Sequence, residues 1–169
     1  MSVVISVIQG SILEAEADVI VNAANSHGIM GGGVAGVIKQ AAGQDVEDQA
    51  RAQAPIPVGQ AVLTSGGKTK FKGIIHAPTM AEPGIRVPAQ NVALATKAAL
   101  ELADEKAFAS IAIPGMGTGV GGVTPHDAAV KMVQEVRTFG PRWLRSVILV
   151  DVDPSMVAAW KKELIVHGL

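Results

Sequence analysis

The chain has 169 residues, of which 49% are hydrophobic and 3% aromatic, and it contains no cysteine. This length and hydrophobic content suit one domain with one core and exclude a wholly disordered chain. The missing cysteines exclude disulfides, thiolate catalysis and Cys-ligated metals. The formal net charge of −1 excludes a strong field toward nucleic acid or an anionic membrane.

The N-terminal run 1–9 contains no basic residue, which indicates a strand and not a signal peptide. No apolar run approaches the roughly 20 residues that span a bilayer. We therefore expect a soluble, cytoplasmic protein. Because aromatic residues are few, Val, Ile, Leu and Ala must fill the core, which favours a sheet covered by helices on both faces.

The first part of the chain predicts two strands and a helix. Val3–Ile8 is β-branched and predicts a buried strand, and Asp18–Ala23 predicts a second. A loop with four glycines, Ser26–Gly33, opens a helix that Gly43 ends. The apolar residues of this helix have the spacing of one buried face; they are Val34, Val37, Ile38 and Ala41.

The middle of the chain predicts a short helix and a hairpin. Gln44–Gln53 reads as a polar helix, which the prolines just after it end. Ala61–Thr64 and Gly73–Ala77 predict two strands joined by the hairpin Ser65–Lys72, and the loop Pro78–Pro88 follows.

The remaining elements complete an α/β pattern. Ala89–Lys106 predicts a long helix, Ile111–Ile113 a strand, and Pro114–Val123 a second glycine-rich loop. Thr124 is the expected N-cap of the next helix, with proline at the first helical position. The last two elements are a strand, Val147–Val150, and a helix, Pro154–Val166.

Six strands and about five helices predict a three-layer α/β/α sandwich with a mixed, six-stranded central sheet. We find no internal repeat and no interdomain linker, so residues 1–169 are expected to form a single domain.

Both glycine-rich loops lie between a strand and a helix, at the sheet edge where ligands bind in open α/β folds. Glycine permits left-handed backbone and close approach of a ligand, so successive amides can surround an anion at a helix N-terminus. Neither loop contains lysine or arginine, so backbone N–H groups would have to hold a phosphate. The alternative is that both loops are simply tight turns.

Other phosphate-binding motifs fit poorly. Gly31, Gly33 and Gly36 match the dinucleotide fingerprint literally, but the preceding strand ends too early and no acidic residue follows at the distance needed to hold a ribose. No Gly-Lys-Ser/Thr sequence exists for a P-loop.

Several motifs together resemble the macro domain family. They are QGSI (Gln9–Ile12), DVIVNAAN (Asp18–Asn25), GGGVAGVIKQAAG (Gly31–Gly43), IIHAPTM (Ile74–Met80) and IPGMGTGVGG (Ile113–Gly122). The last is similar to a branch whose second phosphate loop reads GTGVGG. The motifs occur in the family's order, and the resemblance covers nearly the whole chain.

The resemblance implies an ADP-ribose pocket. Adenine would meet the turn at Ser11 and Ile12, with Asp151 at its border. The diphosphate would lie between the two glycine loops, and Asn25 would reach the distal ribose, although a loop-capping amide is the alternative for Asn25. The ligand-binding residues expected are Ser11, Ile12, Asn25, Gly31, Gly32, Gly33, Val34, Gly117, Thr118, Gly119, Val120, Gly121 and Asp151.

Three positions depart from the family pattern. Ser11 stands where the family usually has Asp, and a hydroxyl accepts more weakly than a carboxylate. Ala35 replaces an acid of the hydrolytic branch. Gly121 replaces an aromatic residue, so we expect more room there.

Few other residues suggest chemistry. Asn25 and His27 are the catalytic candidates, although an exposed loop histidine is the simpler interpretation of His27. His76 lies in an apolar strand, as a core histidine does, and no spaced cluster predicts a metal. We expect no cofactor.

Three functions remain open: a binding module for ADP-ribose and ADP-ribosylated macromolecules; a hydrolase acting on O-acetyl-ADP-ribose or ADP-ribose esters in the same pocket; and an RNA-binding protein. The missing acid at Ala35 favours the binding module. Lys68, Lys70 and Lys72 around Phe71 are the residues that would contact RNA, but a solvated face of a β-ribbon is the simpler interpretation. We expect no membrane partner, and the oligomeric state stays open.

Overall fold

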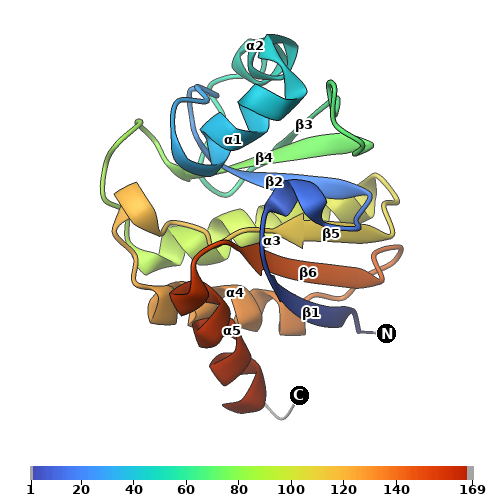
Figure 1. Ribbon diagram of the computed structural model, residues 1–169, viewed down its shortest axis with the longest axis vertical. Helices are drawn as coiled ribbons and strands as arrows, with labels where there is room; N and C mark the ends of the chain where they lie inside the picture. The colour runs from blue at the N-terminus through green and yellow to red at the C-terminus, as the bar shows by residue number, and fades with distance from the viewer. Residues whose placement is uncertain (1, 167–169) are drawn as a thin grey trace.

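The computed structural model describes residues 2–166. Its six strands form one sheet in the order β1-β6-β5-β2-β4-β3. The strands are β1 (Val4–Gln9), β2 (Val19–Asn25), β3 (Val62–Thr64), β4 (Gly73–Met80), β5 (Ser110–Ile113) and β6 (Ser146–Asp151). Only β3 runs antiparallel to its neighbour. The mixed, six-stranded sheet expected from the sequence is therefore confirmed (Figure 1).

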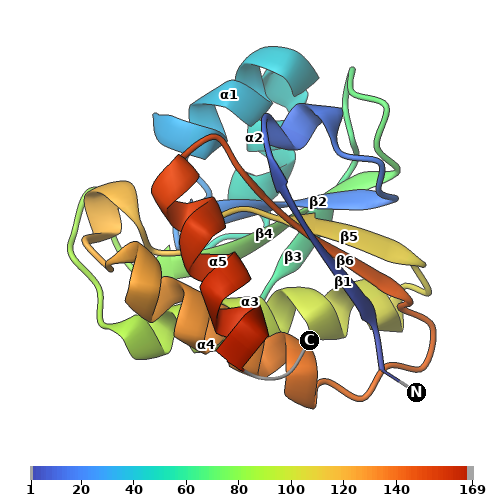
Figure 2. The same cartoon turned by 60° about the horizontal axis from the view of Figure 1, so that its bottom comes forward.

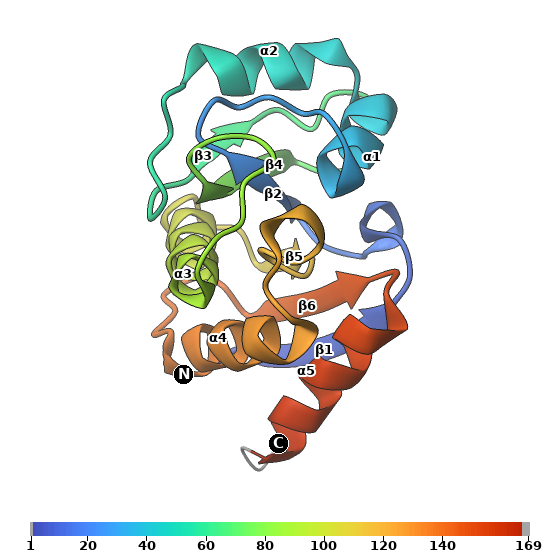
Figure 3. The same cartoon turned by 90° about the vertical axis from the view of Figure 1, so that its left-hand side faces the viewer.

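The helices cover both faces of this sheet. Figure 3 shows α1 and α2 on one side and α3, α4 and α5 on the other. Their bounds are α1 (Gly33–Ala42), α2 (Gln44–Ala52), α3 (Ala89–Glu105), α4 (Pro125–Thr138) and α5 (Pro154–Val166), with two 3-10 turns, η1 (Ile12–Glu14) and η2 (Gly119–Gly121). The three-layer sandwich is confirmed.

Two core clusters follow from the alternation of side chains along each strand. On β2, Val19 and Val21 pack toward α3 while Ile20 packs toward α1. On β6, Leu149 faces the first cluster and Ile148 the second. Because successive strand residues point to opposite faces, a continuous apolar run is what a sheet buried on both sides requires.

The prediction of a buried first strand is wrong for one of its faces. β1 lies at the edge of the sheet, whereas the helices α1 and α2 lie over the part of the sheet with β2 and β4 (Figure 1, Figure 2). Ile5 and Val7 pack against the first core cluster, whereas Val4 is 70% exposed and Ile8 47% exposed. Composition alone does not distinguish an edge strand from a central one.

The buried face of α1 also differs from the expected one. Ala35, Ile38 and Ala42 are its buried residues, whereas Val37, which we expected to face inward, is 47% exposed. The buried face of the helix is therefore centred on Ile38, which is fully buried, and not on Val37. Val34 and Val37 are thereby left for another surface, described below.

The end of α3 and the start of α4 agree with the sequence. Thr124 Oγ1 accepts a hydrogen bond from Asp127 N (3.1 Å), as expected for an N-cap.

The strand β4 is longer than expected, because it continues through Pro78 to Met80, where the sequence predicts a loop. β3 pairs with β4 only as far as His76, so the missing N–H of Pro78 removes no bond from that ladder.

A buried polar group interrupts the apolar sheet at His76. Asn22 Nδ2 donates to His76 Nδ1 (3.1 Å), and His76 Nε2 donates to Thr64 Oγ1 (3.0 Å). Burial lowers the pKa of His76 from 6.5 to about 4. The expected core histidine is confirmed: it is neutral, and it links the three strands β2, β4 and β3.

This shift predicts acid sensitivity. Between pH 6.5 and 4 the unfolded chain binds a proton at His76 and the folded chain does not. The free energy of unfolding should therefore decrease as the pH falls through this window, by roughly 3 kcal/mol, and be unaffected by His76 above it. Urea unfolding at several pH values would measure this. His76→Gln should remove the dependence, and His126→Gln, an exposed residue, should retain it. Equal slopes in wild type and His76→Gln would contradict the assignment.

Candidate functional site

Parallel pairing brings the carboxyl ends of β1, β6, β5, β2 and β4 to one edge of the sheet, and the first four of these strands lead into the candidate site. Gln9 at the end of β1 pairs with Asp151 at the end of β6, and β5 and β2 end beside them. The segments that follow these strands are the turn at 10–12, the glycine loops 26–33 and 114–123, and the chain from 151 onward. The edge therefore collects both glycine loops (Figure 1).

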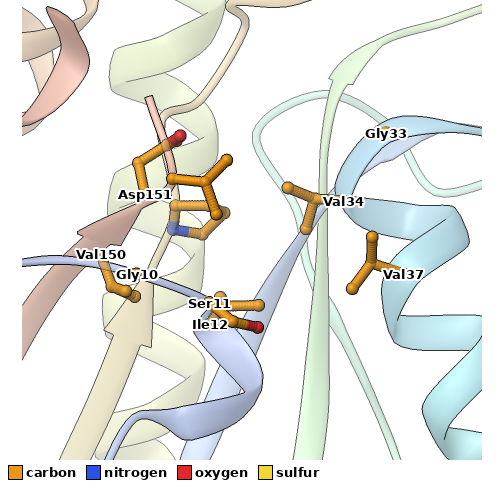
Figure 4. A pocket seen from close by; sticks show the side chains of 10 residues that line it. Gly10, Ser11, Ile12, Gly33, Val34, Val37, Val150 and Asp151 are labelled. Carbon is orange, nitrogen blue, oxygen red and sulfur yellow. The ribbon is translucent and has the colours of Figure 1, made fainter. Parts of the chain in front are cut away.

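A cleft of about 330 Å³ lies at this edge. Figure 4 shows Val34 and Val37 from α1 on one side, Val150 and Asp151 from β6 on the other, and Ser11 and Ile12 between them. The ten lining residues are mostly apolar or glycine; they are Gly10, Ser11, Ile12, Gly33, Val34, Val37, Pro114, Val150, Asp151 and Val152. The exposed side of α1 is thus a wall of this cleft. An apolar slot of this kind suits a flat heterocycle.

Ser11 is fixed by a local cap. It is the N-cap of η1, and its Oγ accepts a hydrogen bond from Leu13 N (3.2 Å). Asp151 is fixed by two backbone donors: its Oδ2 accepts from Gly115 N (3.0 Å) and its Oδ1 from Asp153 N (2.9 Å). These contacts join the base of the second glycine loop to the end of β6.

The first glycine loop ends at the N-terminus of α1. Gly33 is the first residue of the helix and has φ +58°, a conformation that favours glycine. No side chain caps this helix end. A Cβ added at Gly31, Gly32 or Gly33 would meet no atom within 4 Å, so a ligand can approach the backbone closely here. The free N–H groups and the helix dipole favour an anion at this position.

Glu47 of α2 holds this loop from behind. Its Oε2 accepts a hydrogen bond from Met30 N (2.6 Å), and its Oε1 pairs with Lys39 Nζ (2.9 Å) and accepts from Gln44 Nε2 (2.8 Å). Burial raises the pKa of Glu47, but these hydrogen bonds and the Lys39 charge outweigh it and lower the pKa to about 2. Sequence reasoning missed this residue, because a carboxylate in a polar helix carries no signal of burial.

Asn25 caps the loop at its start. Its Nδ2 donates to Ile29 O (2.8 Å), and its Oδ1 accepts from His27 N (3.0 Å) and Ile29 N (3.3 Å). The loop-capping role that we considered is therefore present, and contact with a ribose stays a prediction. His27 is an exposed loop residue whose Nε2 lies 2.7 Å from Glu82 Oε2.

The second glycine loop is tightly folded. Gly117 has φ +72°, and a Cβ there would lie 2.7 Å from Val92 Cγ2. Gly119 also has a positive φ, +65°, but faces open space. A Cβ at Gly121 would lie 3.3 Å from Val87 Cγ2. A side chain at Gly121 would therefore contact Val87 closely, and the additional room expected there stays a prediction.

The loop 81–88 contacts both glycine loops, a role the sequence did not indicate. Glu82 meets His27 of the first loop, and Val87 N donates to Gly121 O of the second (2.9 Å). Arg86 lies against Gly122, where a Cβ would be 2.8 Å from its Nε. A cation therefore lies next to a loop that itself contains none.

The cleft brings together Ser11, Ile12, Gly33, Val34 and Asp151 of the predicted site. The other predicted residues lie along the same edge but do not line this cleft; they are Asn25, Gly31, Gly32, Gly117, Thr118, Gly119, Val120 and Gly121. Sequence reasoning missed Gly10, Val37, Pro114, Val150 and Val152 as lining residues. Their positions next to predicted residues at strand ends were the available signal.

The hairpin considered for RNA offers little to a nucleic acid. Lys70 pairs with Glu16 (3.1 Å) and Lys72 with Asp18 (3.2 Å). Phe71 is buried in the second core cluster, so its ring has no free face on which a base could stack. Within residues 2–166 there is no cluster of three metal-ligating side chains and no helix long and apolar enough to cross a membrane.

The Glu47 anchor can be tested by removing its charge. Glu47→Gln should lower the free energy of unfolding at pH 7 by roughly 2 kcal/mol, because a buried, paired carboxylate is lost. Since the folded pKa is about 2 and the ordinary value 4.5, the contribution is complete above pH 4.5 and is lost as the pH falls toward 2. Denaturant unfolding at pH 7 and pH 3 would measure both. Asp45→Asn, an exposed neighbour on α2, should change stability by less than about 0.5 kcal/mol. Equal effects of the two variants at pH 7 would refute the anchor.

Known proteins resemble this chain in sequence and in fold. An uncharacterized protein of Aquifex aeolicus is 60% identical over 160 residues, which are 95% of this chain and 97% of that protein. The O-acetyl-ADP-ribose deacetylase of Klebsiella pneumoniae is 37% identical over 97% of this chain and 98% of its own length.

Among solved structures, a variant of the Oceanobacillus iheyensis macrodomain with ADPR superimposes with a TM-score of 0.85 at 28% identity, covering 95% of this chain and 91% of that one. The family model described as "Macro domain" matches residues 21–132. This segment includes both glycine loops, β5 and most of β2, and the chain therefore belongs to the macro domain family.

Proposed function

We propose that residues 1–169 form one macro domain that binds ADP-ribose and ADP-ribose conjugates at the sheet edge. The observation that carries the proposal is the apolar cleft that ends at the uncapped N-terminus of α1. A nucleoside diphosphate has the matching order of parts, a flat base followed by an anion. The second loop, Gly117–Gly122, has the sequence of the GTGVGG branch, to which we assign the chain.

The base occupies the cleft between Ser11, Val37 and Val152, and the diphosphate lies over Gly31–Val34, opposite Gly117–Val120. The glycine backbone supports this placement, because Gly33 and Gly119 combine positive φ with open space above them. Backbone N–H groups then hold the phosphates. Asn25, at the start of the first loop, is placed beyond the diphosphate and contacts the distal ribose.

A second candidate function is hydrolysis of O-acetyl-ADP-ribose or of ADP-ribose esters. The Klebsiella relative's name favours it. In this reaction a water adds to the ester carbonyl, the acyl–oxygen bond breaks, and a carboxylic acid and free ADP-ribose are released. Ala35 packs in the second core cluster and supplies no acid or base, so a bound water would depend on positioning by the phosphates and Asn25.

Calorimetric titration tests the binding proposal. Wild type should bind ADP-ribose with micromolar affinity and AMP much more weakly. Gly33→Val and Gly119→Val should each weaken ADP-ribose binding by roughly tenfold or more without unfolding the domain, because a branched side chain strains a left-handed backbone and blocks the approach. Gly140→Val is the matched control, since Gly140 has open space and no positive φ. Unchanged affinity in both loop variants would reject the two-loop mode.

Turnover separates the binding module from the hydrolase. Incubation with O-acetyl-ADP-ribose, followed by chromatography of the products, should yield free ADP-ribose if the site is hydrolytic. Asn25→Ala should then reduce the rate by at least roughly tenfold. Binding without product above the spontaneous rate would leave the binding function alone.

A further inference from the structure

The base end of the cleft has few polar side chains. Among the ten lining residues, only Ser11 and Asp151 have polar side chains. The remaining walls are valine, isoleucine, proline and glycine, which contact any flat heterocycle equally well. Among the lining side chains, these two are therefore the ones that can distinguish one base from another.

The Asp151 side chain is held in place by hydrogen bonds to the backbone. Each of its carboxylate oxygens accepts a hydrogen bond from a main-chain N–H, Gly115 on one side and Asp153 on the other. In Figure 4 its carboxylate lies at the opposite end of the cleft from Ser11. Asp151 thus joins the second loop to β6. Its remaining lone pairs can only accept, and Ser11 is the polar side chain at the other end of the cleft (Figure 4).

Ser11 has hydrogen-bonding capacity of both kinds. Its Oγ accepts one bond, from Leu13 N, which leaves one lone pair and a rotating O–H. It is the one side-chain donor among the lining residues, because an ionised Asp151 only accepts. A hydroxyl in this state accepts from an amino group or donates to a keto oxygen.

We propose that this site binds 6-keto purine nucleotides, such as inosine diphosphate ribose, about as well as ADP-ribose. The inference rests on the proposed function, since it concerns the base end of the same site. Adenine presents a 6-amino donor, which Ser11 Oγ accepts. Hypoxanthine presents a 6-keto oxygen in the same place, to which the Ser11 O–H donates. A carboxylate there would repel the keto oxygen, whereas the hydroxyl removes that penalty.

Two variants of nearly equal shape test this inference, Ser11→Asp and Ser11→Asn. Asp and Asn are both good N-caps, so each should keep the bond to Leu13 N and the turn at η1. Ser11→Asp then presents a carboxylate oxygen to the base, and Ser11→Asn presents an amide N–H₂. The first accepts only and the second donates, so the pair changes the hydrogen-bonding sense with almost no change of shape.

The experiment is calorimetric titration of wild type and both variants with ADP-ribose and with inosine diphosphate ribose. Wild type should bind the two within roughly threefold of each other. Ser11→Asp should prefer ADP-ribose by roughly tenfold or more, and Ser11→Asn should prefer the inosine form. Thermal unfolding of the three proteins should agree, which shows that the turn is intact.

Other results overturn the inference. Wild type that binds ADP-ribose but discriminates tenfold against the inosine form would reject tolerance at Ser11 and leave the proposed function standing. Equal preferences in Ser11→Asp and Ser11→Asn would show that Ser11 does not contact the base edge. Wild type that binds neither ligand would reject the proposed function and this inference with it.

Discussion

In the proposed binding mode the phosphates depend on backbone donors, because the glycine loops 26–33 and 114–123 contain no lysine or arginine. The position of a main-chain N–H is fixed only if the loop that carries it is fixed, and glycine by itself makes a loop less ordered. The structure compensates with side chains fixed outside the loops. Glu47, on α2, accepts a hydrogen bond from Met30 N, and Asp151, at the end of β6, accepts one from Gly115 N. Both are carboxylates that accept backbone bonds, the stronger class of hydrogen bond.

The loop 81–88 adds a third constraint, since it contacts both glycine loops. Glu82 reaches His27, and Val87 donates to Gly121. The separation of the two glycine loops is therefore set partly by a segment that belongs to neither. Val87 also lies close to the Gly121 backbone, since a Cβ there would be 3.3 Å from Val87 Cγ2. In the proposed binding mode, the distal part of the ligand meets a wall supplied by three loops and not by two.

The sequence predicted the layers and the sheet because they follow from local patterns. β-branched runs alternating with amphipathic helices leave few other arrangements, and Thr124 capped α4 as its residue type implied. The predictions that were wrong concern features that depend on contacts between distant parts of the chain. Val3–Ile8 has the composition of a central strand, yet β1 is an edge. Val37 fits the helical period of a buried face, yet it lines the cleft, because an apolar wall of a site and an apolar core look alike in sequence. Glu47 and the loop 81–88 act over distances that no local pattern records.

In the proposed binding mode, Ser11 contacts the base and Asp151 supports the second glycine loop. Both side chains accept backbone hydrogen bonds, but the Asp151 carboxylate can only accept, whereas Ser11 keeps a hydroxyl hydrogen that can donate. A carboxylate at position 11 would also have capped η1, so the cap does not explain why serine is there. The difference lies in the atom that faces the cleft. A hydroxyl that both donates and accepts binds adenine less tightly than a carboxylate would, but it binds more kinds of base. In the proposed binding mode, serine at position 11 therefore sets the ligand specificity and not the stability of the turn.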